Sequence, residues 1–190
     1  MVRPSQGKLV YHLTSLSNAA SIFTHGLLSR NDLHRRGLSF GDVADPEILL
    51  KRQRHQLADY VPFHFFPRNP FDYAVCRTSP DEPMVLLATT RSHAHISRWL
   101  ILPRHPLADE FMTPLPWSEG YRAIDWDLLD QDKRDYTDHD CKVACMAEAL
   151  SPTPVRVRDI TLAFVKTHID AERIKAYFGS KISVNPGMFP

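Results

Sequence analysis

Four polar residues stand in apolar surroundings, where a buried side chain needs either a partner or a function: His12, Arg52, Asp59 and Glu148. A histidine, an arginine and two acids could together hold an anion, orient a ligand or move a proton. Singly they are weak evidence. A lone histidine in a strand is more often a satisfied core residue, and an acid among apolar neighbours is often a paired structural carboxylate.

The segment 58–70, ADYVPFHFFPRNP, combines aromatic rings with three prolines. Its aromatic residues break the alternation of a half-buried strand, and its prolines argue against a helix or a central place in a sheet. Aromatic surface held stiff by proline is a suitable wall for a flat ligand. The segment therefore predicts a ligand-binding cleft.

The net charge of +1 over 190 residues excludes a globally basic nucleic-acid-binding protein. Phosphate recognition would have to come from local clusters of basic residues, and there are two: Arg30, Arg35 and Arg36, then Lys51, Arg52, Arg54 and His55. Such clusters are most often solvated faces.

The three cysteines are an odd number, and the chain shows neither a hydrophobic leader nor a run of membrane-spanning length. We expect a reduced, cytoplasmic protein with a single domain over residues 1–190. Cys141 and Cys145 lack the spacing of a zinc knuckle and no second pair follows, so buried thiols are expected and no metal.

Apolar patterns predict strands at 9–13, 84–89, 100–102, 160–165 and 181–184, and exposed loops at 31–41 and 104–121. Glu148 is ambiguous, because it shares a helix face with Cys141, Ala144 and Cys145 but could also begin a strand. Short helices before and between short strands favour a mixed α+β domain.

Helix starts and stops are marked by particular residues. We expect a helix at 19–25, capped by Ser17 and ended by Gly26, and a second helix that begins at Asp45 and Pro46 and ends at Arg54. A third helix is expected at 91–99, capped by Thr90. A fourth is expected at 171–178, where Asp170 is the cap, Ile169 and Ile174 form a hydrophobic staple and Gly179 ends the helix.

Four stretches occur in the order and rough spacing of one family: YHLTSLSNAASIFTHGLLSRN at 11–31, LLKRQR at 49–54, ADYVPFHFFPRNPFDYA at 58–74 and MAEAL at 146–150. With them the chain resembles the bacterial toxins that ADP-ribosylate DNA bases, the DarT family. The resemblance covers nearly the whole chain. It implies the ADP-ribosyltransferase fold, in which mixed and antiparallel β-sheets form an NAD cleft flanked by short helices.

The resemblance implies NAD-binding roles for eight residues: His12, Thr14, Asn18, Gly26, Leu27, Arg52, Tyr60 and Tyr73. Glu148 matches the family's catalytic glutamate, which favours the strand interpretation of its segment. Arg52 matches the active-site arginine, with Arg54 as the alternative because the spacing departs from the expected adjacent pair. Arg54 and His105 are the candidates for contacts with the substrate.

The implied activity is NAD-dependent transfer of ADP-ribose to a base of single-stranded DNA, with thymine favoured and guanine as the alternative. A macrodomain-type antitoxin is the implied partner. Two other functions remain open: the same fold acting on RNA or another acceptor or as an NAD hydrolase, and a nucleic-acid-binding module without turnover. The last is favoured by departures from the family pattern at Ala149 and at Ser151–Pro152.

Overall fold

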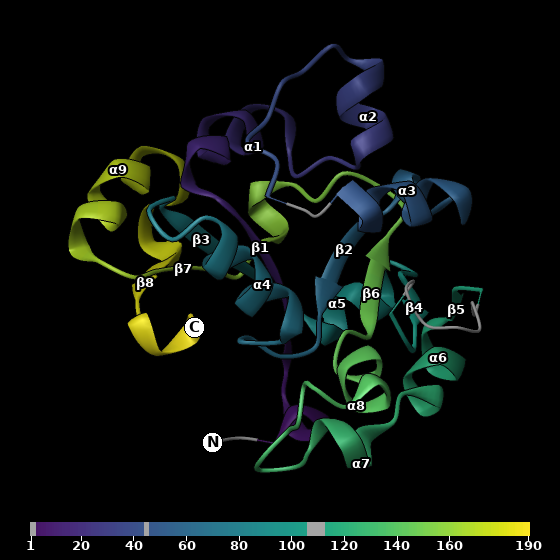
Figure 1. Cartoon of the computed structure of the whole chain (residues 1–190). Coiled ribbons are helices and arrows are strands. Elements are labelled where there is room, and N and C mark those ends of the chain that lie inside the picture. Colours follow the sequence, from purple (N-terminus) through teal and green to yellow (C-terminus); the bar gives the residue numbers. More distant parts are fainter. Residues whose placement is uncertain (1–2, 44–45, 106–112) are drawn as a thin grey trace.

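The computed structural model describes residues 3–43, 46–105 and 113–190, which are organised around one eight-stranded sheet (Figure 1). In order across the sheet the strands are β5 (Leu115–Pro116), β4 (Leu100–Leu102), β6 (Glu148–Ser151), β2 (Val61–His64), β1 (Leu9–Ser15), β3 (Met84–Thr90), β7 (Leu162–Val165) and β8 (Ile182–Val184). Neighbouring strands are antiparallel, except for the parallel pair β7 and β8. The predicted α+β class is confirmed.

The sheet is incompletely paired between β1 and β2. Strand β1 pairs with β3 along its full length, from Leu9 to Ser15, whereas its only partnered residues with β2 are Tyr11 and His64 within the described chain. Pro62 lies in β2 and is paired with β6 on the other side. The prediction that the prolines keep this segment out of a central strand was wrong, because Pro62, which has no N–H to donate, sits where β1 and β2 no longer form a ladder.

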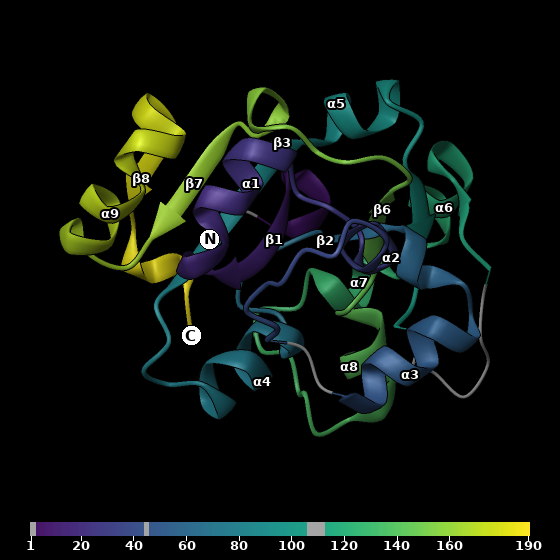
Figure 2. The same ribbon diagram turned by 90° about the horizontal axis from the view of Figure 1, so that it is seen from above.

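The helices of the described residues are α1 (Ala19–His25), α2 (Arg30–Arg35), α3 (Pro46–Arg54), α4 (Pro70–Thr78), α5 (Arg91–Ile96), α6 (Trp117–Ala123), α7 (Trp126–Leu129), α8 (His139–Ala144) and α9 (His168–Phe178). Figure 2 shows α3, α4 and α8 on one side of the sheet and α5 on the opposite side. No helix among the described residues combines the length and apolar character needed to cross a membrane.

Both faces of the sheet are packed. Alternate residues of β3 turn to opposite faces, so that Leu87 joins the larger apolar cluster with Phe63 while Leu86 joins a second cluster with Leu13 and Phe164. Burial of this apolar surface is the main force that holds the sheet between its helices.

The aromatic segment 58–70 is mostly core, not the wall of a cleft. Phe63, Phe65 and Phe66 are all buried, and Phe63 packs against the buried ring of Trp99 with centroids 4.9 Å apart. The expectation of an exposed aromatic wall was therefore wrong for these rings. The alternation typical of a strand is absent because β2 ends at His64, and the buried residues Phe65 and Phe66 follow in an irregular bend.

The two predicted loops contain regular structure. Helix α2 occupies the start of the segment 31–41, β5 lies within 104–121, and α6 begins there and ends at Ala123. Residues 106–112 of the second loop lie outside the described chain, as does Asp45, the predicted cap of α3. Short elements of this kind are set by tertiary packing and have little periodicity of their own.

Several predicted helix signals moved by a few residues. Ser15, not Ser17, caps the turn that leads into α1, and Thr167, not Asp170, caps α9 by accepting from the Asp170 N–H. Ile169 is 74% exposed and so forms no staple. The helix stops at Gly26 and Gly179 are confirmed, both with positive φ.

Candidate active site

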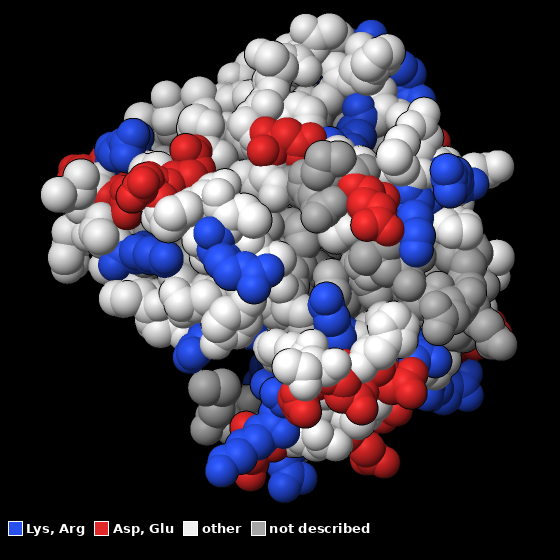
Figure 3. All heavy atoms as spheres, in the orientation of Figure 1, with Lys and Arg blue, Asp and Glu red and all other residues white. Residues whose placement is uncertain are grey.

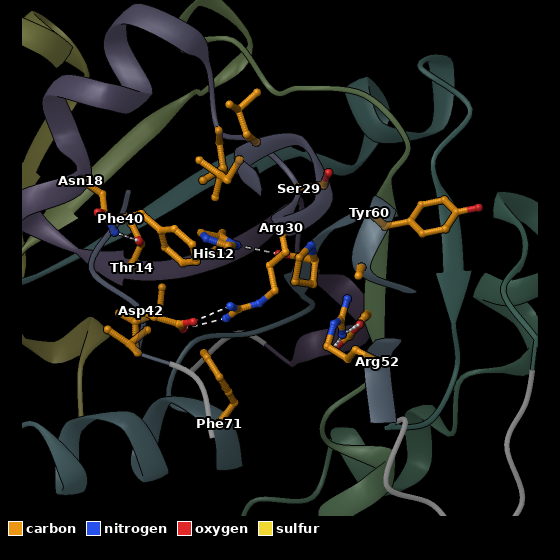
Figure 4. A pocket seen from close by; sticks show the side chains of 18 of the residues that line it. His12, Thr14, Asn18, Ser29, Arg30, Phe40, Asp42, Arg52, Tyr60 and Phe71 are labelled. Carbon is orange, nitrogen blue, oxygen red and sulfur yellow. Dashed lines mark hydrogen bonds and ion pairs between the residues drawn. The ribbon is translucent and has the colours of Figure 1, made fainter. Parts of the chain in front are cut away.

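A cavity of about 1070 Å³, its open mouth included, lies where β1 and β2 separate (Figure 4). Its walls come from both strands, from α1 and the turn after it, from α2 and residues 40–43, from α3 and from the first residue of β6. Its lining combines apolar side chains with a few polar ones, as is typical of small-molecule sites.

Arg52 and Glu148 meet at the wall of this cavity. Arg52 comes from the inner side of α3 and donates from Nη1 to both carboxylate oxygens of Glu148, at 2.7 and 2.6 Å. Both residues are buried, at 6% and 3% exposure. Glu148 begins β6, and its backbone is held between His64 of β2 and Leu102 of β4. Two of the sequence candidates, 96 residues apart, are thus brought together.

The electrostatics favour an ionised Glu148. Burial alone would raise the pKa of its carboxyl group, but the adjacent Arg52 guanidinium opposes burial most strongly, and the net effect holds that pKa below its ordinary value. Burial lowers the pKa of His64, and lowers that of His105 to about 4, so both imidazoles are neutral at pH 7. The ion pair therefore stands beside two neutral rings.

His64 is a site residue that sequence reasoning missed. It lines the cavity and stands opposite Glu148 in the strand register, and its ring lies 5.5 Å from that of Phe71. Pairing β2 with β6 would have pointed to it, but a single sequence gives no register for strands so distant along the chain.

His12 spans the gap between β1 and β2. Its Nδ1 lies 2.7 Å from the Pro62 carbonyl oxygen, which can only accept, so Nδ1 carries the proton. Burial lowers the pKa of His12 to about 4, and the ring is neutral at pH 7. The other ring nitrogen, Nε2, is consequently a hydrogen-bond acceptor.

Asn18 fastens the wall formed by residues 40–43. Its Nδ2 donates to Thr14 Oγ1 at 2.9 Å and to the Gly41 carbonyl at 3.0 Å, while its Oδ1 accepts from the Gly41 N–H at 2.8 Å. The amide is occupied by these contacts, so Asn18 shapes the cavity by holding Gly41 and Thr14 in place.

The turn at Gly26 and Leu27 is fastened as well. Leu27 and Val155 exchange backbone hydrogen bonds at 2.8 and 2.9 Å. Gly26 has a φ of +82°, and a Cβ there would lie 3.2 Å from the Val155 carbonyl oxygen. Glycine therefore permits both the turn and the close approach.

Arg30 and Asp42 form a two-pronged ion pair within the cavity lining, and the Arg30 guanidinium lies 5.2 Å from the centroid of the Phe40 ring (Figure 4). Arg30 was predicted only as part of a basic cluster, and Asp42 and Phe40 were not singled out. The signal they offered was weak, because a polar loop with mixed charges is usually solvated surface.

Other candidates lie at the edge of the cavity or outside its described lining. Tyr60 lines it, but in Figure 4 its ring points away from the other labelled side chains. Tyr73 is 41% exposed and accepts a hydrogen bond from Arg68, and Arg54 is exposed on α3. Asp59 is also on the surface, paired with Arg35 at 3.2 Å, so its apolar neighbours misled the expectation of a buried acid.

The remaining candidate, His105, also lines the cavity. No group of side chains suited to hold a metal ion occurs among residues 3–43, 46–105 and 113–190.

The sequence matches a known family over nearly its whole length. The family model described as "ssDNA thymidine ADP-ribosyltransferase, DarT" matches residues 11–189. A DNA ADP-ribosyl transferase-DNA ADP-ribosyl glycohydrolase fusion protein of Thermosipho africanus is 26% identical over 180 residues, 87% of this chain and 44% of the relative. A DNA ADP-ribosyl transferase of Thermus aquaticus is 26% identical over 134 residues, 64% of this chain and 60% of the relative. The chain thus matches less than two thirds of the length of either relative.

Solved structures share the fold. Thermosipho africanus DarTG in complex with ADP-ribose superposes with a TM-score of 0.80 at 23% identity, covering 96% of this chain and 51% of that one. Thermus sp. 2.9 DarT in complex with ADP-ribosylated ssDNA gives 0.78 at 20% identity and covers 96% of both chains. These likenesses confirm the predicted ADP-ribosyltransferase fold, and with a family model that spans nearly the entire sequence they lead to one assignment: this chain belongs to the DarT family.

Proposed function

We propose that this chain is an NAD-dependent ADP-ribosyltransferase that modifies thymine in single-stranded DNA and acts as the toxin of a toxin–antitoxin pair. The observation that carries the proposal is the buried pair of Arg52 and Glu148 at the wall of the cavity between β1 and β2, in a chain of the DarT family.

In the proposed reaction, the bond between the nicotinamide nitrogen and C1′ of the ribose breaks, and neutral nicotinamide leaves with the bonding electrons. Positive charge develops on the ribose, as in other glycosyl transfers. A ring nitrogen of thymine then forms the new bond to C1′ and loses its proton. Glu148 can stabilise the positive ribose and accept that proton, and its lowered pKa supports this role because only the ionised carboxylate can do either.

Arg52 has two roles in the proposal. Through Nη1 it keeps the Glu148 carboxylate charged and oriented, and its remaining N–H groups are directed to the diphosphate or to the incoming base. Arg52 Nη2 donates a long hydrogen bond of 3.5 Å to the Leu57 carbonyl oxygen.

His12 is assigned to the adenosine half of NAD. Because its Nδ1 donates to Pro62, Nε2 can accept a hydrogen bond but cannot donate one. A ribose hydroxyl can donate a hydrogen bond to this nitrogen, whereas an ionised diphosphate oxygen can only accept one. The tautomer therefore favours a ribose contact for His12.

A single strand is the favoured substrate because its bases are already unpaired. Extruding a base from a duplex costs a few kcal/mol of pairing and stacking, which a single strand avoids. Thermus sp. 2.9 DarT was solved with ADP-ribosylated ssDNA, which supports the same substrate class here.

The partner is inferred from the relatives. The Thermosipho africanus relative is named as a fusion of a transferase with a DNA ADP-ribosyl glycohydrolase, an activity that reverses the modification. We infer that a macrodomain-type antitoxin reverses the modification made by the present chain.

Two further proposals concern the chain as a whole. Residues 1–190 form one domain, and the protein acts in the cytoplasm, where its substrates occur.

The decisive experiment incubates the protein with NAD and oligonucleotides that differ only in base content, single-stranded or duplex, and locates the added mass. We expect one ADP-ribose on thymine of the single strand and release of one nicotinamide. Modification of guanine would correct the base, and modification confined to RNA or protein, or NAD hydrolysis without any acceptor, would replace the proposed substrate. A protein that binds DNA and NAD without turnover would be the non-catalytic module.

A further inference from the structure

A second hollow adjoins the cavity and is lined by α3, α4 and α8, which lie on the same side of the sheet (Figure 2). Including its open side it has a volume of about 1580 Å³. We call it the cationic groove, after the basic residues that the three helices contribute to its lining: Lys51 of α3, Arg77 of α4 and Lys142 of α8.

The cationic groove and the cavity share part of their lining. The residues that belong to both are Asp42, Val43, Ile48, Phe71, His105 and Met146. The groove is thus continuous with the cavity whose wall carries the Arg52–Glu148 pair. A chain lying in the groove would therefore pass next to the place where transfer is proposed to occur.

The charge of this groove is available to a ligand. Lys51, Arg77 and Lys142 make no ion pair among the described residues. Arg77 and Lys142 are exposed and Lys51 is half-buried. The two acids in the described lining are Asp42, which is bound to Arg30, and Glu47.

Most of the other arginines singled out in the sequence are paired. Arg30 is paired with Asp42, Arg35 with Asp32 and Asp59, and Arg52 with Glu148. Arg36 and Arg54 are exposed and make no ion pair among the described residues, but they belong to the described lining of neither hollow. On the face seen in Figure 3, separate basic groups alternate with acidic ones. For a polyanion, the groove is consequently the favoured location next to the cavity.

The wall shared with the cavity is suited to a base. Phe71 is half-buried and lines both hollows, and it contacts the His64 ring beside Glu148. Stacking on an aromatic ring stabilises an unpaired base whatever its identity, and by alanine substitution it is worth about 1–3 kcal/mol per base.

We propose that the cationic groove binds the phosphate backbone of the single-stranded DNA, with Lys51, Arg77 and Lys142 at three phosphates, and delivers the target base past Phe71 toward Glu148. The inference rests on the proposed function and adds to it the path of the strand. It also explains how a chain with a net charge of +1 can bind a polyanion, since the cations come from three elements that converge on one hollow.

The test measures binding of a fluorescein-labelled, thymine-containing single strand by anisotropy over a range of KCl concentrations, without NAD. The variants are Lys51→Gln, Arg77→Gln and Lys142→Gln, singly and together. The control is the triple variant Arg158→Gln, Arg173→Gln and Lys175→Gln, which removes the same charge from exposed positions on and near α9, outside both hollows.

For single strands, each phosphate contact contributes about 0.7 to the slope of log K against log salt. Each single groove variant should lower the magnitude of this slope by about 0.7, and the triple groove variant should lower it by about 2. The triple groove variant should therefore bind the single strand about 100-fold more weakly than the control at 0.1 M salt. Because single variants give a measurable change, the test does not depend on the triple variant.

Transfer assays separate this inference from the proposed function. If the wild type modifies single-stranded DNA and the groove variants bind it with the wild-type slope, the groove assignment is overturned while the function stands. If the wild type neither binds nor modifies single-stranded DNA, the function and the groove assignment both fall. A loss of slope that is equal in the α9 control would also overturn the groove, since the effect would then be one of net charge.

Discussion

Arg52 holds Glu148 through a single nitrogen, Nη1, which lies within hydrogen-bond distance of both carboxylate oxygens. A fork-to-fork pair would use two nitrogens and occupy the edge of the guanidinium. Here the contact fixes the carboxylate while much of the guanidinium edge is left for a ligand. The geometry fits the proposal that the pair has a structural role as well as a catalytic one, and variants at the two positions can separate these roles.

Glu148→Gln should abolish transfer in a folded protein. The substitution keeps the volume and an acceptor for Arg52 but removes the charge and the ability to take up a proton, and loss of general-base action alone costs about 10² to 10⁴ in rate. Release of nicotinamide in the presence of a single-stranded oligonucleotide measures the effect, with circular dichroism to verify the fold. Wild-type activity in this variant would remove Glu148 from the mechanism.

Arg52→Ala should reduce transfer strongly, and Arg54→Ala should have little effect. Arg52 is buried against Glu148, whereas Arg54 is exposed and lies outside the described lining of the cavity. Arg52→Lys should remain impaired, because a lysine ammonium lacks the planar fork. Titration of NAD into each variant and steady-state rates give the order, and the reverse order would transfer the role to Arg54.

Asn18→Ala should weaken NAD binding without abolishing turnover at saturating NAD. It removes three hydrogen bonds that hold Gly41 and Thr14, each worth about 0.5–1.5 kcal/mol. The expected result is a raised KM for NAD with a smaller change in kcat. Thr24→Ala, at an exposed position next to α1's end, is the control. An unchanged KM would mean that the 40–43 wall is held by other contacts.

Asp72 should make stability depend on pH in the opposite sense to an ordinary acid. Burial raises its pKa from 3.8 to about 7, more than its hydrogen bonds from Arg68 and Asn69 can offset. The folded protein keeps the proton that the unfolded chain has lost between pH 4 and pH 7, so stability falls as the pH rises through that range, by about 4 kcal/mol for roughly three units.

The comparison with Asp72→Asn isolates this effect, because asparagine cannot titrate. Urea unfolding of both proteins at pH 4, 5.5, 7 and 8 should show the wild type losing stability relative to the variant as the pH rises to 7, with no further loss above it. A difference between the two proteins that is constant with pH would mean that Asp72 has an ordinary pKa.

Gly120→Ala should destabilise the fold. A Cβ at this position of α6 would lie 2.6 Å from Cβ of Ile101 on β4, so the helix would have to move away from the sheet. Overpacking of this kind costs about 1–3 kcal/mol, against about 1 kcal/mol gained from the better helix propensity of alanine. Ser118→Ala on the exposed side of α6 supplies the control in thermal unfolding, and should be neutral or slightly stabilising.

Elements with strong local patterns could be predicted from the sequence. The strands at β1 and β3, the glycine stops and the inward placement of Arg52 on α3 all follow from periodicity and turn chemistry, and the structure confirms them. The strand start at Glu148 was ambiguous from periodicity, and the family resemblance resolved it correctly.

What could not be predicted depends on contacts between distant segments. The place of His64 opposite Glu148 depends on the pairing of β2 with β6, and Asp59 is an exposed residue whose partner, Arg35, comes from α2. Phe63, Phe65 and Phe66 were read as a wall because their burial is decided by the elements that pack over them, such as the one that carries Trp99. Composition carries no information about such packing.

The incomplete pairing of β1 with β2 has a consequence for how the cavity adapts. Each strand is fixed on its outer side, β1 by β3 and β2 by β6, while one partnered pair and the His12–Pro62 contact join them across the gap. Changing the separation of the two half-sheets would therefore break few backbone hydrogen bonds, whereas the ladders within each half would stay paired. The width of the cleft can therefore change with the separation of β1 and β2, without any change in the side chains that line it.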